Sequence, residues 1–193
     1  YVSNHDQDNP KLVAIPLEGL KNFRIAGADD GKWSKGEGVR FMMNGRMLPI
    51  AMVDCENCGI ENVQVDTRVP QITQVEVLEN DIEAGFITYR IAPYANYRIN
   101  NGRLVTYGAN WEMVPCAGIA FDGESGHLVY NTSDIWVGVN DVVEVSPGVI
   151  RAPWRDARLV PGTVVAMRSY ARPTPGVFLS NCKNTELKRV NVH

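Results

Sequence analysis

Two short acidic motifs are the residues of this 193-residue chain that could most directly do chemistry. Asp29-Asp30 stand before Gly31, and His5-Asp6 lie close to the first residue. A carboxylate can protonate a leaving group or activate water, and a His-Asp pair can act as an acid–base dyad. Both motifs also fit polar turns in which a side chain bonds its own backbone, and we favour that interpretation for each of them.

The motif Cys55-x-x-Cys58 is compatible with a redox or a zinc site. The chain has no second such motif, and His127 and His193 have no ligand-like spacing to it. We therefore favour small apolar filler residues in a core, and we expect no metal and no cofactor.

Side chains that bind sugars form another group of candidates. Trp154 and Arg46 are the candidates that we single out, and Trp111, Trp136 and Tyr94 are further aromatic candidates. Aromatic faces pack against the C–H faces of pyranose rings, and a guanidinium can bond sugar hydroxyls. The alternatives are core packing for the aromatic residues and an ion pair with a neighbouring strand for Arg46.

The elements that would position these residues follow from one pattern that occurs three times. Each copy has a small or apolar residue first, an asparagine third and an aliphatic residue sixth. The copies are Leu20-Lys21-Asn22-Phe23-Arg24-Ile25, Cys55-Glu56-Asn57-Cys58-Gly59-Ile60 and Cys182-Lys183-Asn184-Thr185-Glu186-Leu187. Alternating apolar residues after an asparagine turn are typical of one coil of a parallel β-helix. We expect Asn22, Asn57 and Asn184 to stack, with Ile25, Ile60 and Leu187 pointing inward.

The interval between the second and third copies is too long for one coil, because Ile60 and Leu187 are 127 residues apart. The middle of the chain instead contains short alternating strands and tight turns, which favour an antiparallel barrel or sandwich. We predict strands at residues 71–78, 86–92, 97–99, 103–107, 118–121, 127–130, 142–145 and 164–169, with inward Val75, Val77, Ile87, Tyr89, Leu104, Val129, Val143 and Val165.

The predicted fold class is all-β: right-handed parallel β-helix coils with an inserted antiparallel β-barrel domain. We predict the first coils at residues 1–67, the barrel at 68–175 and a further, truncated coil at 176–193. The chain begins at Tyr1 rather than methionine, and we expect it to be a mature or excised piece of a longer protein.

Several motifs resemble glycoside hydrolase family 110, the bacterial exo-acting α-1,3-galactosidases, in the same order along the chain. They are Tyr1-Val2-Ser3-Asn4-His5-Asp6-Gln7, Asn9-Pro10-Lys11, Ile15-Pro16-Leu17-Glu18, Asn44-Gly45-Arg46-Met47-Leu48-Pro49 and Pro175-Gly176-Val177-Phe178. The chain departs from the family pattern at Asn44 and Thr174, where the family commonly has histidine. We expect neither change to disturb the fold and either of them to alter the surroundings of a site.

The resemblance implies an inverting hydrolase that removes terminal α-1,3-linked galactose from glycans such as the blood group B antigen. It also implies catalytic aspartates in later coils, beyond His193, so we carry no catalytic residue onto this chain and expect the chain alone to be inactive. Exported enzymes of this kind meet glycans in the periplasm or outside the cell, and we expect that location.

The bulk composition adds exclusions. The net charge of −3 is spread over interspersed acids and bases, which argues against nucleic-acid partners, and no apolar run is long enough to span a membrane. We expect oligosaccharide or glycoconjugate partners and leave a homo-oligomer open. Two alternatives to an enzyme piece remain: a non-catalytic carbohydrate-binding or scaffold β-helix module, and a structural β-helix such as an adhesin stalk.

Overall fold

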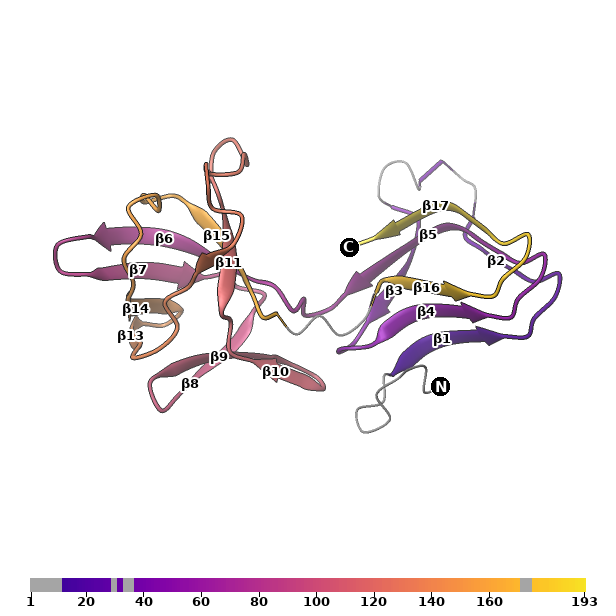
Figure 1. Cartoon of the computed structure of the whole chain (residues 1–193), viewed down its shortest axis with the longest axis horizontal. Helices are drawn as coiled ribbons and strands as arrows, with labels where there is room; N and C mark the ends of the chain where they lie inside the picture. Colours follow the sequence, from indigo (N-terminus) through magenta and orange to yellow (C-terminus); the bar gives the residue numbers. More distant parts are fainter. Residues whose placement is uncertain (1–11, 29–30, 33–36, 171–174) are drawn as a thin grey trace. The chain divides into compact units, whose positions relative to one another are not determined.

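The computed structural model describes residues 12–28, 31–32, 37–170 and 175–193. Across those ranges the regular structure is all β, with no helix. The chain divides into two compact units (Figure 1), which are Tyr1–Arg68 with Pro173–His193, here unit 1, and Val69–Arg172, here unit 2. The predicted all-β class is confirmed.

Unit 1 consists of parallel strands in two sheets (Figure 1). The first sheet has the order β1-β4-β16, with β1 at Val13–Glu18, β4 at Leu48–Val53 and β16 at Val177–Ser180. In the second sheet β5 (Gly59–Thr67) pairs with β17 (Glu186–Val192) on one side and with β2 (Arg24–Ala26) and β3 (Val39–Met43) on the other.

The three repeated motifs stack in register, as predicted. Ile25 and Leu187 both pair with Ile60, from β2 and β17 respectively. Ile60 is fully buried and Ile25 is partly buried, whereas Leu187 is 40% exposed. Leu187 remains exposed because β17 pairs only with β5 among the described strands.

The predicted asparagine column is also confirmed. Asn57 Nδ2 donates to Asn22 Oδ1 at 3.2 Å, and Asn184 Nδ2 donates to Asn57 Oδ1 at 3.0 Å. All three residues have positive φ, between 50° and 55°, a left-handed conformation that asparagine tolerates better than most residues. The motif therefore specifies both the turn and the bonds between layers.

A second column of left-handed residues lies three positions earlier in each layer. Gly19, Asp54 and Asn181 all have positive φ, and the Asn181 amide donates to Asp54 Oδ1. The sequence motif did not reveal this column because its members are three different residue types.

The core of unit 1 lies between the stacked strands and includes Cys55 and Cys58, with Cys182 packed against it. The thiol of Cys55 donates to the carbonyl of Leu17, and the thiol of Cys182 donates to that of Met52. Burial raises the pKa of the Cys55 thiol, so it stays protonated and unreactive at neutral pH. The cysteines therefore pack as the sequence pattern indicated.

Unit 2 is a barrel-like domain built from two antiparallel sheets. The larger sheet has the order β12-β11-β15-β6-β7-β14-β13, and the smaller has the order β10-β9-β8. The strands are β6 (Thr73–Asp81), β7 (Phe86–Ile91), β8 (Asn96–Asn100), β9 (Arg103–Gly108), β10 (Trp111–Met113), β11 (Ala117–Phe121), β12 (Ile135–Trp136), β13 (Val143–Ser146), β14 (Val149–Pro153) and β15 (Val164–Arg168).

In unit 2 the predicted β8–β9 hairpin turn is present, whereas one predicted strand is absent and one observed strand was not predicted. Asn101 and Gly102 both have positive φ in the β8–β9 turn, as a tight Asn-Gly hairpin requires. The strand predicted at residues 127–130 is wrong, because this segment forms only a single bridge between Leu128 and Phe121. Strand β14, which was not predicted, lies between β7 and β13.

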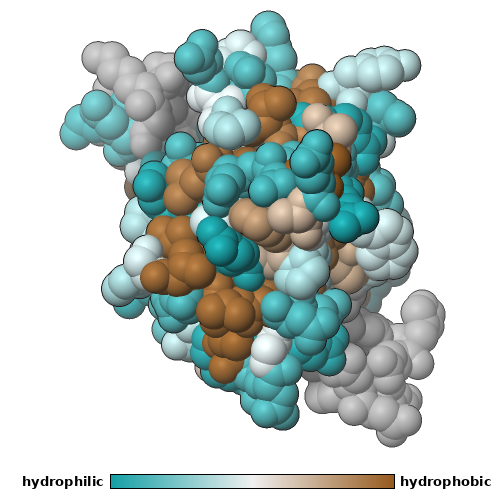
Figure 2. Space-filling model, turned by 90° about the vertical axis from the view of Figure 1, so that its left-hand side faces the viewer, coloured by the Kyte–Doolittle hydropathy of each residue, from teal (hydrophilic) through white to brown (hydrophobic). Residues whose placement is uncertain are grey.

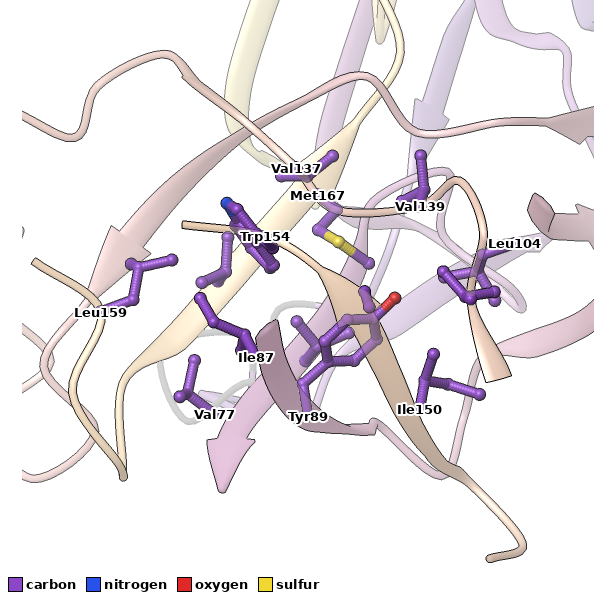
Figure 3. Close-up of a cluster of buried hydrophobic side chains, with 14 of the residues drawn as sticks. Val77, Ile87, Tyr89, Leu104, Val137, Val139, Ile150, Trp154, Leu159 and Met167 are labelled. Carbon is purple, nitrogen blue, oxygen red and sulfur yellow. The ribbon is translucent and has the colours of Figure 1, made fainter. Parts of the chain in front are cut away.

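The core of unit 2 is one cluster of buried side chains, which includes Val77, Ile87, Tyr89 and Leu104 (Figure 3). Val75 and Val165 are also buried and Val129 is partly buried, as predicted.

The inward placement of Val143 is wrong: Val143 is 61% exposed, and Val142 is the buried residue at 4%. A shift of one residue exchanges the faces of a strand, and the sequence has valine at both positions. Apolar side chains also reach the surface elsewhere, and Figure 2 shows brown, apolar side chains among polar ones on the face that it displays.

Candidate functional site

Trp154, the leading aromatic candidate for sugar stacking, is a core residue. Its side chain is only 7% exposed and packs edge-on against Tyr89, with ring centroids 6.1 Å apart (Figure 3). Gly138 makes room for it, since a Cβ on Gly138 would lie 2.6 Å from the Cβ of Trp154. This burial leaves the indole no open face for a sugar, which corrects the stacking prediction.

The other predicted residues lie in different environments. Trp111 is buried against Gly108, Tyr94 is partly exposed, and Trp136 is 76% exposed. Arg46 is half-buried in the bend between β3 and β4, and its sugar-binding role remains a prediction. His5-Asp6, Asp29-Asp30 and Thr174 lie outside the described residues. Within the described part of unit 2, Trp154 and Trp111 are core residues and Trp136 faces solvent, so these aromatic candidates do not share one surface.

A cavity of about 390 Å³ lies on the small sheet β8–β9–β10 of unit 2. Its volume falls within the roughly 300–1,000 Å³ typical of small-molecule sites. The lining residues are Asn100, Asn101, Arg103, Val105, Glu112, Met113 and Val114. Sequence reasoning missed this site because most of its residues lie on three different strands, and a local pattern does not show how those strands pair.

Two polar side chains of this cavity are held in place by neighbours. Arg103 Nε donates to Asn140 Oδ1 at 3.1 Å, and the Glu112 carboxylate accepts from Arg98 Nη2 at 2.5 Å. The Arg98 guanidinium also lies over the ring of Tyr107, 5.3 Å from its centroid. These contacts restrict the guanidinium of Arg103 and the carboxylate of Glu112 before any ligand arrives.

This arrangement can bind a neutral polar molecule. Amide, guanidinium and carboxylate groups bond hydroxyls, while the apolar Val105, Met113 and Val114 contact C–H groups. Glu112 is the single carboxylate among the lining residues. Glycoside hydrolysis needs two carboxyl groups, so these residues provide binding groups without an acid–base pair.

Within the described part of the chain, no group of three or more histidine, cysteine or acidic side chains could hold a metal ion. The same residues contain no helix long and apolar enough to cross a membrane.

Comparison with known proteins shows what the chain is similar to. Residues 73–165 match the family model described as GLAA-B beta-barrel domain I. The whole chain is 49% identical to alpha-1,3-galactosidase B of Parabacteroides distasonis, 48% to that of Phocaeicola vulgatus and 49% to that of Bacteroides fragilis. The chain spans about 30% of the length of these curated relatives, 30% of the first and 31% of the other two.

The identities extend over 100% of the chain, so they cover unit 1 as well as the barrel-like unit. The resemblance inferred from the sequence is therefore confirmed: the chain is similar over its whole length to bacterial proteins named alpha-1,3-galactosidase B, and its residues 73–165 match the model of GLAA-B beta-barrel domain I.

Proposed function

We propose that the chain is part of a glycoside hydrolase that removes terminal α-1,3-linked galactose from glycans such as the blood group B antigen, with inversion of configuration. The observation that carries this proposal is the 47–49% identity, over the whole chain, to proteins named alpha-1,3-galactosidase B. Glycan substrates of such an enzyme occur outside the cytoplasm, so we place the protein in the periplasm or outside the cell.

The chain's own part in this function is to bind and position the glycan. Inversion requires an acid and a base about 6.5–9.5 Å apart, and the cavity on β8–β9–β10 contains one carboxylate. We propose that the catalytic aspartates belong to a part of the enzyme that this chain does not contain, and that the chain alone is inactive.

We further propose that unit 1 begins a right-handed parallel β-helix. The columns of asparagines support this proposal, since side-chain ladders are how solenoid layers stack. The last layer also exposes Leu179 and Val192, whose partners Met52 and Val65 are buried in the layer below. A further coil would cover these side chains and continue the column from the Oδ1 of Asn184.

A non-catalytic carbohydrate-binding or scaffold module is the alternative. It is favoured by the same observation that argues for inactivity of the chain, namely the lack of a second carboxylate in the cavity. We call a protein that contains this chain and has the full length of its relatives the extended protein. The two proposed functions differ in one result: a galactosidase predicts that the extended protein hydrolyses a galactoside, and a binding module predicts that it does not.

The deciding experiment compares hydrolysis of blood group B trisaccharide by the chain and by the extended protein. We expect released galactose with the extended protein and none with the chain. No turnover by the extended protein would favour the binding module. Turnover by the chain, abolished by Asp29→Asn with Asp30→Asn or by His5→Ala with Asp6→Asn, would overturn the inactivity of the chain.

A further inference from the structure

Trp136 is exposed at the edge of the large sheet of unit 2, although its neighbours on both sides are buried. Ile135 and Val137 are 6% and 9% exposed and belong to the core. Strand alternation therefore turns the Trp136 indole outward, where it is 76% exposed. A tryptophan held out of the core by buried neighbours presents a large apolar face to solvent.

The strand register places a basic residue on the same face as Trp136. Trp136 pairs with Ala117, and Ala117 pairs with Arg168 on the next strand. Two strand spacings separate the backbones of Trp136 and Arg168 by roughly 10 Å. Gly118 and Met167, the neighbours of Ala117 and Arg168, face the core, so the row from Trp136 to Arg168 faces outward.

Arg168 forms a fixed group with an acidic and an aromatic residue. Its Nη2 donates to Asp134 Oδ1 at 2.7 Å, and the Tyr170 hydroxyl donates to Asp134 Oδ2 at 3.1 Å. The guanidinium also lies 4.9 Å from the centroid of the Tyr170 ring. The bond to Asp134 raises the pKa of Tyr170, so its hydroxyl remains a donor at neutral pH.

These four residues, Asp134, Trp136, Arg168 and Tyr170, are here called the Trp136 platform. Ala117, which lies between Trp136 and Arg168 in the register, is 1% exposed. The platform is separate from the β8–β9–β10 cavity, because none of its residues lines that cavity.

We propose that the Trp136 platform is a second, non-catalytic binding surface for galactose-containing oligosaccharides. A pyranose can pack its C–H face on the indole, while hydroxyls of the adjoining sugar reach the carboxylate of Asp134, which the largely buried Arg168 holds in place. The span of roughly 10 Å between Trp136 and Arg168 suits two linked sugars better than one. The choice of galactose as the sugar rests on the proposed function. The stacking of a sugar ring on the Trp136 indole does not depend on that function.

The charged part of the platform favours a sugar over a second copy of this chain. Cores of protein interfaces are depleted of charged residues, and the platform carries an ion pair beside its exposed ring. The side chain of Asp134 is 46% exposed, so its carboxylate is accessible to hydroxyls of a ligand.

The test is titration of the 193-residue chain with the disaccharide galactosyl-α-1,3-galactose, followed by ¹⁵N NMR of the tryptophan indoles and by calorimetry. We expect saturable shifts of the Trp136 indole signal, and at least a tenfold weaker affinity in Trp136→Ala and Asp134→Asn. Tyr130→Ala is the matched control, because Tyr130 is a still more exposed aromatic residue outside the platform. Its affinity should equal that of the unchanged chain.

Equal affinity in Trp136→Ala, or the absence of any shift at the Trp136 indole, would overturn the proposal. So would a dimer in sedimentation that Trp136→Ala dissociates, since the platform would then join two copies. Hydrolysis by the extended protein is measured separately on the soluble trisaccharide. If the extended protein hydrolyses the trisaccharide but the disaccharide does not bind at Trp136, only the proposal of the Trp136 platform is refuted. If the disaccharide binds at Trp136 but the extended protein is inactive, only the proposed galactosidase function is refuted.

Discussion

Arg24 and Glu186 form an ion pair although 162 residues separate them in the chain, with Arg24 Nη1 3.3 Å from Glu186 Oε2. Gly59 lies between them in the register of β2, β5 and β17. Because Gly59 has no side chain, Arg24 can cross the middle strand and reach the layer beyond it. The pair thereby links the layer before the barrel-like unit to the layer after it.

Glycines at two positions of unit 1 should differ in their tolerance of a methyl group. A Cβ at Gly59 would lie 2.9 Å from Arg24 Nη1, which can swing away, whereas a Cβ at Gly27 would lie 2.1 Å from the backbone oxygen of Asn62. We expect Gly59→Ala to lower the free energy of unfolding by less than about 1 kcal/mol. Gly27→Ala should lower it by about 1–3 kcal/mol. Urea unfolding of unit 1 measures both, and equal losses would contradict the close approach at Gly27.

The asparagine column predicts an order of stabilities among glycine variants. Glycine adopts positive φ without strain, so these variants isolate the side-chain bonds. Asn57 makes two bonds within the column and Asn22 makes one. At about 0.5–1.5 kcal/mol per bond, Asn57→Gly should cost more than Asn22→Gly, and Asn57→Ala should cost more still. Thermal unfolding followed by circular dichroism tests this order, which fails if Asn22→Gly is the most damaging variant.

Asp156 should contribute stability that depends on pH. Its side chain is 9% exposed and accepts from Arg158 Nε at 2.7 Å, and the bonds from Arg158 hold the pKa of Asp156 below its ordinary value. A lowered pKa in the folded state means that the contribution is full above the unfolded pKa of about 3.9 and is lost as pH falls through the folded value. Asp156→Asn should therefore cost about 1 kcal/mol at pH 7 and little at the acid end. Urea midpoints measured from pH 7 down to pH 3 check this, with the exposed Glu83→Gln as control. A cost that stays constant over that range would be evidence against the ion pair.

Neighbouring valines in unit 2 should respond differently to truncation. Val142 is buried in the core, whereas Val143 is exposed on the edge strand β13. Val142→Ala should cost about 2 kcal/mol, and Val143→Ala should stay within about 0.5 kcal/mol. Denaturant unfolding monitored by tryptophan fluorescence compares them directly. The reverse order would restore the register expected from the sequence.

Residues of the β8–β9–β10 cavity should affect substrate binding rather than chemistry in the extended protein. Arg103 and Glu112 line the cavity, and no second carboxylate accompanies Glu112 there. We expect Arg103→Ala and Glu112→Gln to raise KM about tenfold while kcat stays within about twofold, as loss of uniform binding predicts. Steady-state kinetics on the trisaccharide measure this, with Glu76→Gln on the large sheet as a matched control. A hundredfold fall in kcat at Glu112 would instead place the chemistry in this cavity.

The barrel-like unit shows how far alternation alone can identify a strand. Six of the eight residues predicted to face inward are buried, because valine and isoleucine at every second position fit a sheet with one buried face. Strand β14 was not predicted, although Ile150-Arg151-Ala152 alternates, because Pro153 in the same run counts against a strand. Strand β14 pairs with β7 on one side and with β13 on the other. Because β7 is distant in the sequence, a local pattern does not show this pairing.

Features that depend on local backbone geometry and on repeated spacing can be predicted from the order of the amino acids alone. The third position of each motif requires a left-handed turn, and asparagine at Asn22, Asn57 and Asn184 supplies both that conformation and the bond to the next layer. The tight Asn101-Gly102 hairpin follows from the same conformational preference.

Which aromatic and polar side chains face solvent depends on contacts between distant parts of the chain. Trp154 packs against Tyr89 whereas Trp136 is exposed, although both are tryptophans beside turns in the same unit. The reason is physical: the face on which a side chain lies depends on pairing with strands tens of residues away, such as that of Ala117 with both Trp136 and Arg168. The residue type sets how strongly a side chain prefers to be buried, and the pairing of distant strands determines whether that side chain is buried.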